Sequence, residues 1–200
     1  MNLHIKGFLY KLIIDPLLAS VRASIISKTE LSSSVIDIAC GTGTLAFDMA
    51  NYVAEVTAID LDEDLISYAS LRAVKKRVRN IHFEKRDASD LSIYRDKQFD
   101  IAVTSMSIHQ FEAKLAVEIL SEMKRIAIKV IVADYNYPLP EKFSGKVAKG
   151  IEKLAGADHY RNFLKYMNSG GLKYFTDKAG LEIMSAQIRG SGVFILTVCR

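Results

Sequence analysis

Cysteine is rare in this sequence of 200 residues, which has only Cys40 and Cys199. Two distant cysteines make neither a disulfide framework nor a metal-ligand cluster, and they are typical of a protein from a reducing compartment. Histidine, the other common metal ligand, occurs four times, at His4, His82, His109 and His159. These positions show no spacing typical of metal ligands, so the sequence predicts no metal site.

The sequence also lacks a long uninterrupted apolar run near its start. Lys6, Lys11 and Asp15 interrupt the apolar residues there, and no small-residue cleavage pattern follows. Neither a signal peptide nor a membrane span fits this pattern, so we expect a cytoplasmic protein with no membrane partner. The apolar residues of positions 3–26 instead recur with a helical period, and Pro16 predicts a break between two helices.

A strong charge of one sign is absent as well. The net charge of +4 permits an acidic partner without requiring one, so no nucleic-acid partner is expected. The basic cluster of residues 72–79 has no interleaved aromatic residues, and we interpret it as the solvated end of a helix. Half of the residues are hydrophobic, enough for one sizeable core. Residues 1–200 are therefore expected to form one domain, working as a monomer or homodimer, with residues 1–30 as a helical cover over the sheet.

The most informative stretch is residues 35–46, where an apolar run ends in a small-residue loop and a helix follows. This pattern predicts a buried strand, a tight turn and the start of a helix. Gly41 and Gly43 have no Cβ, so a ligand could approach the backbone there. Asp37 is costly inside an apolar strand unless backbone N–H groups or a ligand ammonium satisfy its carboxylate. The alternative is that Asp37 only braces its own loop.

A second carboxylate follows at the end of the next predicted strand, residues 55–60. Asp60 has the position of the acid that accepts the ribose hydroxyls in dinucleotide-binding folds. A glycine pair alone is weak evidence for a ligand site. The evidence is stronger here because the elements occur in the expected order: strand, glycine loop, helix, strand and terminal acid. The sequence thus predicts a site for a ligand with ribose hydroxyls at the carboxyl ends of these strands.

The run Asp37-Ile-Ala-Cys-Gly-Thr-Gly-Thr, together with Asp60, resembles the first two motifs of class I S-adenosylmethionine-dependent methyltransferases, and most closely their small-molecule branch. The resemblance extends over residues 34–200, and it implies S-adenosyl-L-methionine as cofactor. Ala39 departs from the pattern, because the family often has glycine there. The resemblance also implies an N-terminal segment that closes over the cofactor, with Tyr10 as a candidate contact.

The third and fourth motifs of the family also have counterparts. Asp87 and Ala88 follow the predicted strand 81–86, and the resemblance implies that they bind the adenine; alternatively, Asp87 caps the following turn. Ser105 ends the predicted strand 98–105. The cofactor-binding residues that the resemblance implies are Asp37, Ala39, Cys40, Gly41, Gly43, Asp60, Leu61, Asp87, Ala88 and Ser105.

Five alternations of strand and helix predict a doubly wound parallel sheet. Residues 181–186 and 193–198 are the last two predicted strands, and their link is too short for a parallel crossover. The predicted fold class is α/β, with a seven-stranded, mostly parallel, Rossmann-like sheet and an antiparallel C-terminal strand. Residues 137–171, after the predicted fifth strand 128–133, are expected to be a substrate-side insertion.

The predicted reaction is methyl transfer to a small-molecule acceptor by in-line displacement. His109 follows the fourth strand and is a candidate base if it is unpaired near pH 7, although it could instead cap a helix or pack beside Phe111. Tyr135 and Asn136, expected beyond the fifth strand, complete the candidate catalytic trio. A non-catalytic adenosyl-binding protein remains an alternative. An NAD-dependent oxidoreductase is disfavoured, because Ala46 leaves the glycine motif incomplete.

Overall fold

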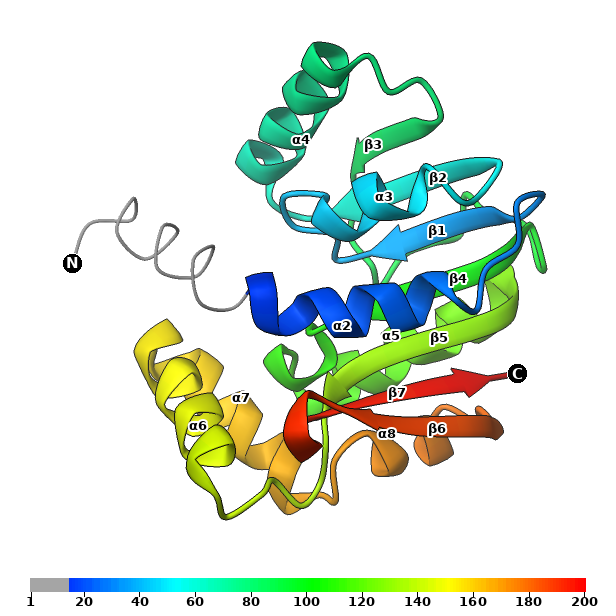
Figure 1. Ribbon diagram of the computed structural model, residues 1–200. Helices are drawn as coiled ribbons and strands as arrows, with labels where there is room; N and C mark the ends of the chain where they lie inside the picture. The colour runs from blue at the N-terminus through cyan, green and yellow to red at the C-terminus, as the bar shows by residue number, and fades with distance from the viewer. Residues whose placement is uncertain (1–14) are drawn as a thin grey trace.

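Seven strands form one sheet in the computed structural model, which describes residues 15–200 (Figure 1). The strands are β1 (Ser34–Ile38), β2 (Glu55–Asp60), β3 (Ile81–Lys85), β4 (Phe99–Ser105), β5 (Ala127–Tyr135), β6 (Ile183–Arg189) and β7 (Phe194–Cys199). Their spatial order is β3-β2-β1-β4-β5-β7-β6. The first five are parallel, whereas β7 is antiparallel to both β5 and β6. The predicted fold class is therefore confirmed.

Helices lie on both faces of the sheet. The α-helices are α2 (Asp15–Ile26), α3 (Thr44–Met49), α4 (Glu63–Lys76), α5 (Ala113–Ile126), α6 (Phe143–Ala155), α7 (Ala157–Asn168) and α8 (Leu172–Lys178). Two short 3₁₀ turns are η2 (Ile108–Gln110) and η3 (Gly190–Gly192). Figure 1 shows α2 and α3 on one face and α5 and α8 on the other. This double cover explains why β1 and β4 read as continuous apolar runs rather than as alternating patterns.

The helix α2 packs its apolar side on the sheet, where Val21 and Ile25 are fully buried. Arg22 pairs with Asp48 of α3, with Nε and Oδ2 2.7 Å apart. Pro16 lies in the first described turn of α2. The predicted helix before Pro16, and Tyr10 with it, lie outside the described residues. Among residues 15–200, no helix has the length and apolar character needed to cross a bilayer.

Residues 137–171, the predicted insertion, contain α6 and α7. Figure 1 shows these two helices beyond the ends to which β1 and β5 point. The helix α6 packs on α7, and α7 packs on η2, which directly follows β4. The segment therefore covers the carboxyl ends of the central strands, the edge where the candidate site residues gather.

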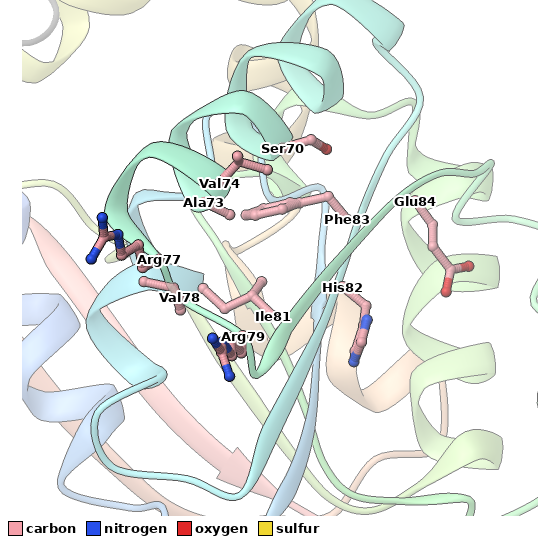
Figure 2. Close-up of a pocket in the computed structure, with 10 residues that line it drawn as sticks. All are labelled: Ser70, Ala73, Val74, Arg77, Val78, Arg79, Ile81, His82, Phe83 and Glu84. Atoms are coloured by element: carbon pink, nitrogen blue, oxygen red, sulfur yellow. The ribbon is translucent and has the colours of Figure 1, made fainter.

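An open groove of about 770 Å³ lies elsewhere, between the end of α4 and the edge strand β3 (Figure 2). Residues from both elements line it, including Val74, Arg77 and Ile81. None of the predicted site residues lines this groove. The predicted site residues lie at the strand ends and not in this groove.

Candidate functional site

Asp37 lies in β1 with its carboxylate buried. The residue is only 1% exposed, and its Oδ2 atom has no hydrogen-bond partner. Burial, followed by repulsion from the Asp60 carboxylate, raises the pKa of Asp37 to about 8. A buried carboxyl group without a donor is unfavourable to ionise, so this position suits a cationic ligand group.

Asp60 ends β2 and holds the glycine loop in place. Its Oδ2 accepts a hydrogen bond from the Gly41 N–H at 2.7 Å, and its Oδ1 accepts one from the Asp62 N–H at 3.0 Å. Each oxygen keeps a lone pair that can accept from a ligand hydroxyl, because a carboxylate oxygen has two. The sequence predicted the position of Asp60 but not its role in bracing the loop.

The loop between β1 and α3 has a left-handed backbone at three positions. Ala39, Gly41 and Gly43 have φ values of 58°, 55° and 73°. Ala39 directly follows β1 and adopts the conformation that a glycine would accept without strain. At Gly41 a Cβ would meet no atom within 4 Å, which leaves the space above the loop open. At Gly43 a Cβ would lie 2.6 Å from Cε1 of Phe83, so packing alone requires this glycine.

We expect Gly43→Ala to destabilise the protein by about 2 kcal/mol or more, because a methyl group must displace the Phe83 ring and adopt a left-handed φ. Gly41→Ala is the matched control, since it has the same backbone strain and no clash. Its expected cost is about 1 kcal/mol. Chemical denaturation of both variants measures the difference, and equal losses would contradict the packing role of Gly43.

The remaining predicted cofactor residues lie along the same edge. Asp87 Oδ1 accepts hydrogen bonds from the backbone N–H and the hydroxyl of Ser89. In this structure Asp87 therefore caps the following turn, which was the alternative to adenine binding. Its contact with adenine, and that of Ala88, stay predictions. Leu61 is 63% exposed next to Asp60, and Ser105 is half-buried at the end of β4. Burial, then the charges of Asp37 and Asp60, raises the pKa of the Cys40 thiol, which stays neutral.

His109 is buried in η2 and is paired, contrary to the expectation of an unpaired histidine. Its Nδ1 lies 2.6 Å from Oδ1 of Asp134, and its backbone N–H donates to Oδ2 of the same carboxylate. Burial opposes a charged imidazole, but Asp134 and then Glu152 outweigh it and raise the pKa of His109 to about 9. In this arrangement the imidazole is already protonated at neutral pH, so it is not poised to accept a proton.

Glu152 of α6 joins this cluster from above the strand ends. Its Oε2 lies 3.5 Å from Nε2 of His109 and 2.6 Å from Nε2 of His159. Its Oε1 accepts a hydrogen bond from the Tyr135 hydroxyl at 2.6 Å. Burial opposes ionisation of Glu152, but the neighbouring side chains of His109 and His159 keep its pKa below the usual value.

The structure brings only two members of the predicted trio together. Tyr135 is the last residue of β5, which runs two residues further than predicted, and its ring contacts His109 with centroids 4.8 Å apart. Asn136 faces elsewhere, because its side chain donates to the Gly192 carbonyl at 3.0 Å. Sequence reasoning missed Asp134, although an acid in an apolar strand is the signal that identified Asp37.

The histidine spacing predicts no ligand set, whereas the structure brings three potential ligand side chains close together. Each of His109, Glu152 and His159 offers one potential ligand atom, and these three atoms lie within 4.8 Å of one another. The three residues come from η2, α6 and α7, so their separation along the chain carried no sign of this proximity.

Comparison with known proteins agrees with this geometry. A family model described as a methyltransferase domain matches residues 35–129, which include β1 without its first residue, all of β2 to β4 and the start of β5. The chain is 30% identical over 138 residues to a ubiquinone biosynthesis O-methyltransferase of Xanthomonas oryzae pv. oryzae (strain PXO99A). This match covers 66% of the chain and 56% of the relative, so the chain spans less than two thirds of that protein.

Solved structures share the fold over nearly the whole chain. A SAM-dependent methyltransferase from Aquifex aeolicus superimposes with a TM-score of 0.68 at 17% identity, covering 97% of both chains. Magnesium protoporphyrin IX methyltransferase from Synechocystis PCC 6803, solved with bound SAH, gives a TM-score of 0.66 at 18% identity and covers 100% of this chain and 87% of that one. In the motifs at Asp37, Gly41 and Asp60, in its strand order and in these matches, the chain is similar to the class I S-adenosylmethionine-dependent methyltransferases.

Proposed function

We propose that this chain transfers a methyl group from S-adenosyl-L-methionine to an oxygen atom of a small-molecule acceptor. The observation that carries the proposal is the arrangement of Asp37, Gly41 and Asp60 at the ends of β1 and β2. S-adenosylmethionine supplies an electrophilic methyl group when it is bound. An oxygen acceptor is supported by the name of the relative, an O-methyltransferase.

The residues present fit the cofactor. The unpartnered Oδ2 of Asp37 suits an ammonium group, and the two oxygens of Asp60 suit a pair of ribose hydroxyls. Gly41 leaves open space for a ligand against the loop. The exposed side chain of Leu61 offers an apolar surface for a base. The predicted adenine contacts of Asp87 and Ala88 complete the proposed cofactor site.

Positioning is the main task of the protein in this proposal. Holding two reactants in line contributes on the order of 7 to 11 kcal/mol to lowering the barrier, whereas a general base contributes roughly 3 to 5. The loop after β1 holds one reactant, and α6 and α7 cover the strand ends where the acceptor would lie. The catalytic roles of His109, Tyr135 and Asn136 stay predictions, and the buried, paired state of His109 favours positioning over base catalysis.

The proposed setting is the cytoplasm, which the two free cysteines Cys40 and Cys199 support. A monomer or homodimer without a nucleic-acid partner remains the expected form. Lys75 and Lys76 lie in the last turn of α4, where their charges complement the helix dipole. This role supports the interpretation of the basic cluster as a solvated helix end and not as a nucleic-acid-binding surface.

Transfer of a radiolabelled methyl group tests this function. The protein is incubated with labelled S-adenosylmethionine and a series of small aromatic alcohols and phenols, each paired with its methyl ether as a control without a free hydroxyl. We expect label to enter at least one hydroxylated compound and not its ether. Binding of the cofactor without transfer to any of these compounds or to a cell-extract fraction would instead support the non-catalytic alternative.

A further inference from the structure

We propose that His109, Glu152 and His159 form a binding site for one divalent transition-metal ion, such as Zn²⁺. Two imidazole nitrogens and one carboxylate oxygen are a donor set that Zn²⁺ and its neighbours in the first transition row bind well. The three donor atoms lie within 4.8 Å of one another in the ion-free structure. This site is separate from the residues proposed to hold the cofactor, and the inference does not depend on methyl transfer.

The distances suit a zinc shell after small side-chain movements. Donor atoms about 2.0–2.2 Å from a tetrahedral zinc ion stand roughly 3.4 Å apart. The separation of His109 Nε2 from Glu152 Oε2 is already 3.5 Å. His159 Nε2 and Glu152 Oε2 are closer, at 2.6 Å. These two atoms must move apart by about 0.8 Å to admit the ion.

Two buried groups outside the donor set hold the donors in place. Asp134 accepts from Nδ1 of His109 at 2.6 Å, which leaves Nε2 as the nitrogen that faces Glu152. The ion would displace the proton that the charged imidazole carries on Nε2 in the ion-free structure. The Tyr135 hydroxyl donates to Oε1 of Glu152, which leaves Oε2 to face the two histidines. A carboxylate behind a metal-binding histidine is the usual outer-shell arrangement, because it fixes the ring orientation and makes the ligand more basic.

Two of the three donor atoms also lack aligned hydrogen bonds. Nε2 of His109 and Oε2 of Glu152 are both buried without a hydrogen-bond partner of good geometry. The side chain of His159 is 26% exposed, so an ion can enter past it, and water can occupy a fourth coordination position. Asp134 and Glu152 bring two buried negative charges, which a divalent cation would compensate.

Metal binding is tested with the full-length chain after dialysis against a chelator. Calorimetry with Zn²⁺ alone measures stoichiometry and affinity, and Co²⁺ provides visible d–d absorption that reports the coordination number. The test variants are Glu152→Gln and His159→Gln. His82→Gln is the matched control, because His82 is an exposed histidine of β3 away from the cluster.

We expect one equivalent of Zn²⁺ to bind to the wild type and to His82→Gln, with a four-coordinate cobalt spectrum. Both test variants should lose more than about tenfold in affinity. Since His159 is partly exposed, His159→Gln should keep its circular dichroism even if Glu152→Gln fails to fold. The proposal is overturned if the wild type binds no Zn²⁺ at micromolar concentrations, which would leave the cluster as an ion-pair network. It is also overturned if a folded His159→Gln variant binds Zn²⁺ as tightly as the wild type.

Discussion

Replacing Asp60 with alanine is expected to weaken the binding of S-adenosylhomocysteine by about a hundredfold or more. Hydrogen bonds to a charged group contribute about 1.5 to 3 kcal/mol each, and two ribose hydroxyls can bind this carboxylate. A loss of about 1.4 kcal/mol is a tenfold loss in affinity, so two such bonds correspond to at least a hundredfold. Calorimetric titration measures the effect directly.

Asp60 also holds the glycine loop in place, so Asp60→Ala could weaken binding by disordering the loop. The control must separate this effect from the loss of hydrogen bonds to the ligand. An analogue of S-adenosylhomocysteine without the ribose hydroxyls serves this purpose, in a cycle of two proteins and two ligands. If Asp60 binds the hydroxyls, Asp60→Ala should affect the analogue far less than the natural ligand. An equal loss for both ligands would show that Asp60 acts only by accepting from the Gly41 and Asp62 N–H groups.

The second large effect is a dependence of ligand affinity on pH through Asp37. The pKa of this buried carboxyl group is raised to about 8, so the ligand-free protein holds a proton there at pH 7. An ammonium group placed against Oδ2 favours the ionised form and releases that proton. Affinity for S-adenosylhomocysteine should therefore rise as the pH increases from 6 to 8, by up to about tenfold per unit.

Calorimetry at pH 7 in buffers with different ionisation enthalpies counts the released protons. We expect up to about one proton per ligand for the wild type and none for Asp37→Asn, whose affinity should be lower at pH 8 and nearly independent of pH. Asp64→Asn is the control, because Asp64 is exposed in the first turn of α4. Equal proton release by Asp37→Asn and the wild type would exclude Asp37 as the ammonium-binding group.

The same raised pKa affects the stability of the ligand-free protein. The folded state binds the Asp37 proton more tightly than the unfolded state, where the pKa of the carboxyl group is near its ordinary 3.8. This contribution to the free energy of unfolding is therefore full below about pH 4 and is lost as the pH rises to about 8. Its upper bound is roughly 6 kcal/mol. Asp37→Asn should show a flatter stability profile in denaturant titrations over this range.

The sequence located the cofactor side of the site because each of its acids has a local signal. Asp37 interrupts a buried strand and Asp60 ends the next one, so parallel pairing brings their strand ends to one edge. Asp134 carries the same signal within β5 and could have been predicted in the same way. The extension of β5 to Tyr135 was not predicted, because its last residues pair with β7, far along the chain.

The His109 cluster could not be predicted from local patterns. Glu152 lies on the buried side of α6, with Gly145 and Ala148, and a single glutamate on such a helix carries no sign of its partners. Its contacts depend on how α6 and α7 fold over the ends of the strands, which no local pattern specifies. The same argument applies to His159, because the sequence shows the histidine but gives no sign that it contacts Glu152.

We infer that the edge formed by Asp37, Gly41 and Asp60 binds an adenosyl cofactor with a charged amino group rather than a dinucleotide. Calorimetric titration of the wild-type protein with S-adenosylhomocysteine, and separately with NADH, tests it most directly. We predict saturable binding of S-adenosylhomocysteine with one ligand per chain and no measurable binding of NADH at the same concentrations. Saturable binding of NADH without binding of S-adenosylhomocysteine would contradict the account.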